Sequence, residues 1–211
     1  MKRLICISIL LIGCDLNSKP EVQLQVEKVK PWLVDEAQVR GINFTWISGD
    51  TGKFNMPEII GGGAAMLDYD NDGDLDLYFI QGGHLGSTKT ESNVLLRNDE
   101  GNFVDITAQS NTGNTGYGMG VAIGDYNNDS FVDIYITNVG NNVLLKNNGD
   151  GTFEDVTDHA GVGDSGWGAS TSFADFDKDG DLDLYATNYL VWSDDLDLEC
   201  FNARGNLAYC S

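Results

Sequence analysis

An acidic loop followed by an apolar strand occurs three times in this chain, and this repetition constrains the fold more than any other feature. The loops cover residues 68–76, 125–133 and 175–183, and they read DYDNDGDLD, DYNNDSFVD and DFDKDGDLD. A run such as Leu77–Ile80, with β-branched and aromatic residues, follows each loop and favours a strand. Each unit is therefore predicted to be a loop that leads into a strand.

Each loop offers oxygen atoms at alternate positions: side chains at positions one, three, five and nine, and a backbone carbonyl at position seven. A crowded shell of hard oxygen donors is what Ca²⁺ prefers, whereas zinc and copper favour nitrogen and sulfur. We therefore predict about three bound Ca²⁺ ions, one in each loop. The predicted ligand positions are Asp68, Asp70, Asp72, Asp74 and Asp76 in loop one, Asp125, Asn127, Asp129, Phe131 and Asp133 in loop two, and Asp175, Asp177, Asp179, Asp181 and Asp183 in loop three.

Two alternatives to this calcium loop exist. An EF-hand loop needs a bidentate Glu at position twelve and a helix on each side, but position twelve is Phe79, Ile136 or Ala186 here. Ordinary polar turns without metal are the other alternative, because Asp, Asn and Gly form such turns readily. Three copies at matching offsets favour the calcium loop. Loop two is expected to bind Ca²⁺ more weakly, because Asn127 and Ser130 replace a carboxylate and a turn glycine.

The charge of the chain agrees with a demand for cations. Its 211 residues include 12 Lys and Arg against 33 Asp and Glu, a formal charge of −21, and thirteen of the acids lie in the three loops. Carboxylates packed this closely repel one another unless a cation lies between them. The same charge repels phosphate groups, so we expect no nucleic acid partner and no binding to anionic lipid headgroups.

The N-terminus has the pattern of an export signal. Residues 1–13 combine a basic start with the short apolar run Leu4–Ile12, which is typical of a signal peptide and too short for a membrane-spanning helix. Residues 11–14 resemble a bacterial lipobox, in which Cys14 is lipidated and residues 14–38 form a linker. An ordinary signal peptide with an incidental cysteine is the alternative. We expect an exported lipoprotein, held on the membrane only by its lipid and facing the periplasm or the cell exterior, or else a secreted protein.

Export would also allow a disulfide. Cys200 and Cys210 lie ten residues apart in a loop with Gly and Asn. Thiols pair in oxidising compartments. We predict a Cys200–Cys210 disulfide.

The repetition extends beyond the acidic loops, which are spaced by 57 and then 50 residues. The segment Asn93–Asn98 recurs as Asn142–Asn147, and Phe103–Thr107 recurs as Phe153–Thr157. A period near 50 residues with short strands predicts the blades of a β-propeller. We predict an all-β fold over residues 39–211, a partial propeller of four-stranded antiparallel blades with calcium loops. Its repeats cover about 58–110, 111–160 and 161–211, the last one incomplete.

The number of repeats is small for a propeller, which usually has four to eight blades. Ile42, Phe44 and Trp46 alternate with their neighbours as in a strand, and such an N-terminal strand commonly completes the last blade. We therefore expect this chain to be an N-terminal fragment, with the missing C-terminal blades of the same protein as partners. Closure by association is the alternative.

The segments Met56–Tyr78 and Asn147–Thr157 resemble the FG-GAP/VCBS repeats of the ASPIC/UnbV, cartilage acidic protein-like family. The resemblance covers nearly all of the chain from about Ile42 onward, and residues 188–210 are similar to that family's insertion after the third metal loop. It implies an integrin-alpha-type propeller, typically of seven blades, that is exported and binds calcium. The FG-GAP signature itself is degenerate, with Tyr117 and Trp167 in place of Phe.

These features predict an exported, calcium-binding propeller scaffold for interaction or adhesion with a protein or glycan, with no catalytic residues in this segment. The alternative is a polysaccharide-active enzyme whose catalytic part lies elsewhere, since the loop carboxylates are better explained as metal ligands than as a glycosidase pair. A calcium sensor is a third alternative, but a sensor needs a bistable element and a closed propeller is rigid.

Overall fold

The structure is a computed structural model that describes residues 32–86, 91–193 and 195–210. The chain divides into two compact units, Met1–Asp35 and Glu36–Ser211, and the repeats lie in the second. The predicted signal peptide, the predicted lipidation site Cys14 and most of the predicted linker lie outside the described residues. Within the described ranges, no helix is both long enough and apolar enough to cross a bilayer.

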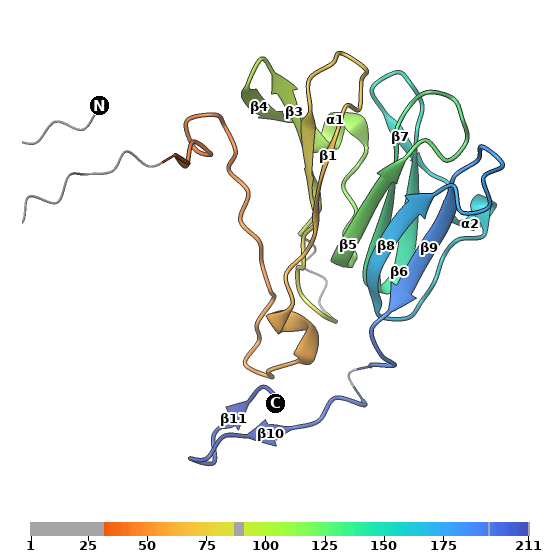
Figure 1. Cartoon of the computed structure of the whole chain (residues 1–211). Coiled ribbons are helices and arrows are strands. Elements are labelled where there is room, and N and C mark those ends of the chain that lie inside the picture. The colour runs from red at the N-terminus through yellow and green to blue at the C-terminus, as the bar shows by residue number, and fades with distance from the viewer. Residues whose placement is uncertain (1–31, 87–90, 194, 211) are drawn as a thin grey trace, which may run out of the picture. The chain divides into compact units, whose positions relative to one another are not determined.

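Repeat one forms a four-stranded antiparallel sheet in which each strand pairs with the next along the chain (Figure 1). The acidic loop joins the first two strands, where Leu67 faces Asp76. The strands have the β-branched and aromatic content that a pleated, half-buried surface requires. The elements are η1 (Met56–Ile59), β1 (Ala64–Leu67), β2 (Asp76–Phe79), β3 (Val94–Asp99), β4 (Asn102–Asp105) and the short helix α1 (Thr107–Ser110).

Repeat two has the same plan in β5 (Tyr117–Gly124), β6 (Asp133–Asn147), β7 (Phe153–Asp155) and α2 (Thr157–Ala160). Its sheet has the order β5-β6-β7 because β6 takes the place of two strands. The backbone N–H of Asn147 donates to Asp133 at 2.8 Å, and that of Asn138 donates to Asn142 at 3.0 Å. Gly140 lies between them with φ of 102°. The two halves of β6 therefore fold back on each other and supply the second and third strands of the blade.

Repeat three has only the pair β8 (Gly168–Ala174) and β9 (Asp183–Asn188), followed by the hairpin β10 (Cys200–Phe201) and β11 (Leu207–Ala208). The prediction of an all-β fold with antiparallel blades is confirmed. The sheets of the described residues do not close into a ring, which agrees with a partial propeller.

The main core lies between the sheets of repeats one and two. Tyr78 and Leu95 from the first sheet meet Ile136 and Phe153 from the second, and all four side chains are buried. Small residues let the blades approach closely, since a Cβ on Gly118 would lie 2.2 Å from Cγ2 of Ile80.

The exposure of three equivalent tyrosines shows which repeats are covered by the repeat that follows them. Tyr78 and Tyr135, two residues after position nine of their loops, are 0% and 1% exposed. Their hydroxyls donate to the carbonyls of Thr112 and Val162 in the segment leading to the next repeat, both at 2.7 Å. The equivalent Tyr185 is 72% exposed. The face of repeat three is therefore uncovered within the described part of the chain.

The segment predicted as an N-terminal strand is extended but forms no strand. Phe44 stacks on Phe79 of β2, with ring centroids 4.7 Å apart. Tyr78 faces repeat two and side chains alternate along a strand, so this contact lies on the opposite face of the first sheet. The Gln81 side chain donates to the Thr45 carbonyl and accepts from the Ile47 N–H. It thus replaces the backbone partners that a neighbouring strand would provide.

Candidate metal loops

The three acidic loops share one backbone geometry. In loop one, the carboxylate of Asp68 accepts hydrogen bonds from the N–H groups of Asp72 and Gly73 at 3.1 and 3.0 Å. Asp125 and Asp175 make the equivalent bonds in loops two and three. The residues at positions four and six have positive φ in every loop, a conformation that Gly and Asn adopt most readily. The choice of Asp, Asn and Gly thus follows from the turn as well as from metal chemistry.

Position nine connects each loop to the sheet. Asp76 accepts from the Tyr69 N–H at 3.0 Å and from the Asn98 N–H at 2.8 Å. In repeat two, Asp133 accepts from Tyr126 and Asn147 in the same way. Asp76 and Asp133 are the first residues of strand two in their repeats. Their carboxylates therefore join the second residue of the loop to strand three.

The asparagines at or next to the end of strand three have a role that the sequence did not assign to them. The amide of Asn98 donates to the Leu75 carbonyl at 3.1 Å, and the amide of Asn147 donates to the carbonyls of Tyr69 and Val132. Asn147 therefore forms hydrogen bonds both to its own loop and to loop one. The signal was present in the repeated segments Asn93–Asn98 and Asn142–Asn147, which both end in Asn.

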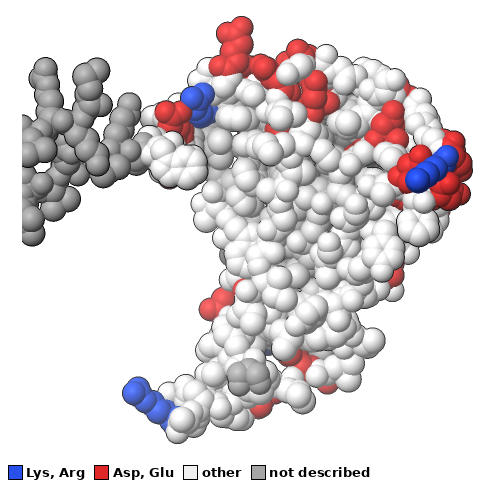
Figure 2. Space-filling view, viewed as in Figure 1, with Lys and Arg blue, Asp and Glu red and all other residues white. Residues whose placement is uncertain are grey.

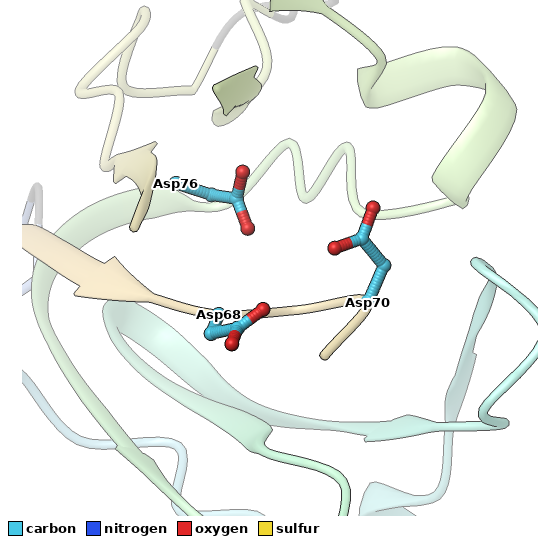
Figure 3. Close-up of side chains that lie close together, drawn as sticks. All are labelled: Asp68, Asp70 and Asp76. Carbon is cyan, nitrogen blue, oxygen red and sulfur yellow. The ribbon is translucent and has the colours of Figure 1, made fainter. Parts of the chain in front are cut away.

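Carboxylates at positions one, three and nine converge in two of the loops. Asp68, Asp70 and Asp76 place oxygen atoms within 4.8 Å of one another (Figure 3). In loop two, Asn127 replaces the carboxylate at position three. Among the described residues, the second group of three carboxylates is in loop three, at Asp175, Asp177 and Asp183.

The side chains at position five, which were predicted as ligands, and those at position seven lie outside these groups. Asp72, Asp129 and Asp179 accept from the N–H two residues further on. Asp74 accepts from the Glu100 N–H, 3.3 Å away, and Asp181 accepts from loop two. The structure therefore brings together the side chains at positions one, three and nine, and the backbone carbonyl at position seven, as in Phe131, stays a predicted ligand.

The electrostatics of loop one fit a hard divalent cation. Asp70 Oδ1 is buried and has no hydrogen-bond partner, which is costly for an anionic oxygen. Burial, reinforced by neighbouring carboxylates and opposed by the backbone hydrogen bonds, raises the pKa of Asp76 from 3.8 to about 6. The pKa of Asp133 is raised to about 6 by the same causes. A Ca²⁺ ion held by these oxygens would neutralise the charge that burial disfavours.

The three loops lie along one edge of the Glu36–Ser211 unit. Figure 2 shows Asp and Glu side chains gathered along this edge and sparse on the rest of the visible face. Hydrogen bonds join adjacent loops: the Asn71 amide donates to the Ser130 carbonyl and the Asn128 amide donates to Asp181. The candidate sites thus form a row, one for each blade.

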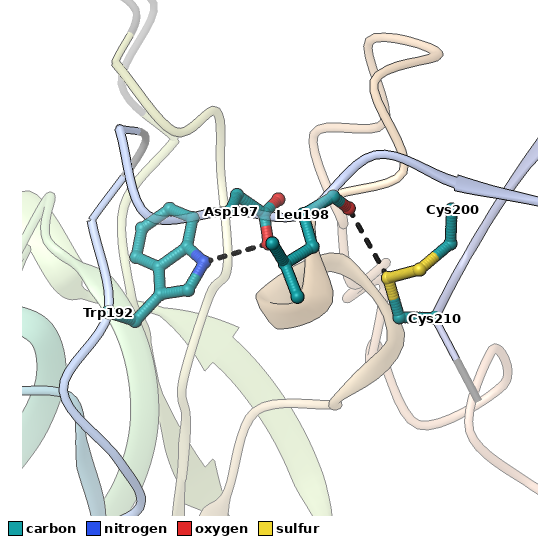
Figure 4. The surroundings of a disulfide bond; sticks show 5 residues. All are labelled: Trp192, Asp197, Leu198, Cys200 and Cys210. Carbon is teal, nitrogen blue, oxygen red and sulfur yellow. Dashed lines mark hydrogen bonds between the residues drawn. A yellow bond between two sulfur atoms is a disulfide. The ribbon is translucent and has the colours of Figure 1, made fainter.

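The predicted disulfide is confirmed. Cys200 and Cys210 are bonded, with Cα atoms 5.2 Å apart, and they close the β10–β11 hairpin (Figure 4). The Cys210 sulfur lies 3.2 Å from the Leu198 carbonyl oxygen, a packing contact because a disulfide sulfur carries no proton. Nearby, the Trp192 indole N–H donates to Asp197 at 3.1 Å.

A family model described as an FG-GAP-like repeat matches residues 68–136 and 125–186. Together the two matches span more than half of the 211 residues. The chain belongs to the FG-GAP-like repeat family. Each FG-GAP-like match runs from one acidic loop to the next, so the family unit includes the junction between two blades. No curated protein matches the chain.

Proposed function

We propose that this FG-GAP-like chain is a calcium-stabilised propeller segment that serves as a scaffold for binding a protein or a glycan and carries out no catalysis itself. The observation that carries the proposal is the loop geometry, in which position one organises the turn and position nine joins it to the sheet. Asp76 and Asp133 each accept backbone N–H groups from two segments. A cation at this point stabilises the blade.

The proposed location is outside the cytoplasm, with a lipid on Cys14 that anchors the protein facing the periplasm or the cell exterior. The disulfide between Cys200 and Cys210 supports an oxidising compartment. The basic and apolar N-terminal residues support export.

Within the FG-GAP-like family, we assign the chain to the ASPIC/UnbV type, and we propose that further repeats of the same protein cover repeat three. The resemblance of residues 188–210 to the insertion of that type supports the assignment. The exposure of Phe176 and Tyr185 supports the proposal that further repeats cover repeat three. The equivalent residues of repeat one, Tyr69 and Tyr78, are buried by repeat two.

Calcium titration tests the proposal. The chain, freed of metal by chelation and gel filtration, is heated with and without Ca²⁺, and its shape is followed by small-angle X-ray scattering. Each site at one hundred times its Kd adds about 2.7 kcal/mol to the free energy of unfolding, so we expect a higher Tm and an unchanged radius of gyration. An unchanged Tm would overturn calcium binding, and a large change in shape would favour a sensor instead.

Matched variants locate the effect. Asp68→Asn with Asp175→Asn removes the position-one carboxylate from loops one and three, and most of the gain in Tm should be lost. Asp158→Asn removes an exposed acid from α2, outside the loops, and the gain in Tm should be retained. An equal loss in both variants would show that the gain reflects overall charge screening.

A further inference from the structure

Position four of loops one and two points a side chain toward the next loop. Asn71, Asn128 and Lys178 occupy this position, and all three have left-handed backbones, with φ of 59°, 58° and 66°. The Asn71 amide donates to the carbonyl of Ser130 at 3.0 Å. The Asn128 amide donates to the carboxylate of Asp181 at 2.6 Å. The same position therefore makes a contact across both junctions between loops.

The first contact acts on the weakest part of loop two. Ser130 takes the place of the glycine found in the other loops, and its φ is 72°, which is unfavourable for a residue with a Cβ. The peptide between Ser130 and Phe131 is held at both ends, because its carbonyl accepts from Asn71 and its N–H donates to Asp129 at 3.0 Å. This peptide directly precedes the Phe131 carbonyl, the predicted ligand at position seven. Fixing its plane helps to set the direction of that carbonyl.

The second contact acts on the same turn of loop three. The carboxylate of Asp181 accepts from Asn128, while the Asp181 N–H donates to Asp179 at 2.9 Å. Both Asp181 and Asp179 are predicted ligand positions. A neutral amide suits this place, since it donates a hydrogen bond without adding charge to a crowded acidic edge.

We propose that Asn71 and Asn128 are positioning residues through which each metal loop orients the next, so that Ca²⁺ binds to the row of loops in a coupled manner. Loop two depends most on this contact, because it has lost both a carboxylate and its turn glycine. The inference rests on the proposed binding of calcium. Coupling of this kind is reciprocal, so an ion in loop two also favours the arrangement of loop one.

The variant Asn71→Gly tests the proposal, because glycine keeps the left-handed backbone and removes only the amide. Lys178→Gly is the matched control: it changes the same position at a similar φ, and Lys178 makes no hydrogen bond to another loop among the described residues. Calorimetric titration of the metal-free chain with Ca²⁺ should show the weakest site of Asn71→Gly weakened about threefold to tenfold, the usual effect of one hydrogen bond. Lys178→Gly should weaken no Ca²⁺ site, because it removes a positive charge from an acidic loop and breaks no contact between loops.

A double-mutant cycle assigns the effect to loop two. Asp129→Ala removes the predicted ligand at position five of that loop, and in its background Asn71→Gly should no longer alter the weakest Ca²⁺ site. Asn128→Gly gives the same test for loop three with a separate contact. Unchanged binding constants in both glycine variants would overturn the proposal while leaving calcium binding intact. Equal weakening by Lys178→Gly would also overturn it, and an unchanged chain that binds no Ca²⁺ would refute the proposed function itself.

Discussion

At the scale of single residues, the buried carboxylates at position nine connect the fold to metal binding. Asp76 and Asp133 have no exposed surface, and both carboxylates accept two backbone N–H groups. Desolvation outweighs these bonds and raises the pKa of each group to about 6. Each of these two carboxylates is therefore stabilised either by a proton or by a bound cation.

This competition predicts a pH dependence. The folded, metal-free chain keeps these two protons up to about pH 6, whereas the unfolded chain loses them near pH 4. The stabilisation from the protons is complete below about pH 4 and is lost as the pH rises through about 6. Because Ca²⁺ binds the ionised carboxylates, the rise in Tm that saturating Ca²⁺ causes should be larger at pH 7.5 than at pH 5. Scanning calorimetry of the metal-free and Ca²⁺-loaded chain measures both rises in Tm. Equal rises at the two pH values would contradict the prediction.

At the scale of elements, the first strands of repeats two and three lie so close to the preceding repeat that they require glycine. Gly61, Gly118 and Gly168 occupy the same place, seven residues before position one of their loops. A Cβ on Gly118 would lie 2.2 Å from Ile80, and one on Gly168 would lie 2.7 Å from Thr137. A Cβ on Gly61 would meet nothing within 4 Å.

Alanine substitution should therefore separate these equivalent positions. Gly118→Ala should lower the free energy of unfolding by about 1–3 kcal/mol, because overpacking displaces side chains or backbone. Gly61→Ala should change it by less than about 0.5 kcal/mol. Urea denaturation measures both values, and a similar loss in the two variants would show that strand conformation, rather than contact between blades, requires the glycine.

The elements also show what the sequence could reveal. The acidic loops, the antiparallel strands and the disulfide follow from local residue chemistry, and repetition made the loops and strands clear. The packing of Ile42–Ile47 did not follow, because its alternation fits any extended segment and the side chain of Gln81, distant in sequence, replaces a partner strand. The contacts of Asn71 and Asn147 with neighbouring loops also depend on how two blades pack. No pattern within one repeat encodes that arrangement.

At the scale of the whole unit Glu36–Ser211, stability should vary from blade to blade, because each repeat is stabilised mainly by its neighbours. Repeat two contacts repeats one and three, and its Ile134 and Ile136 have no exposed surface. In repeat three, β8 is the one described strand that pairs with β9, and Tyr185 of β9 lies open to solvent.

Amide hydrogen exchange should therefore be slowest in the first half of β6 and faster in β9 by about a hundredfold or more, since exposed edge strands open locally at low cost. Mass spectrometry of peptides from the two strands measures the difference. Ca²⁺ should slow exchange in both strands, because a metal loop precedes each of them. Equal protection of β9 and β6 in the metal-loaded chain would mean that a second chain covers repeat three in solution, and a concentration dependence of the protection of β9 would identify that association.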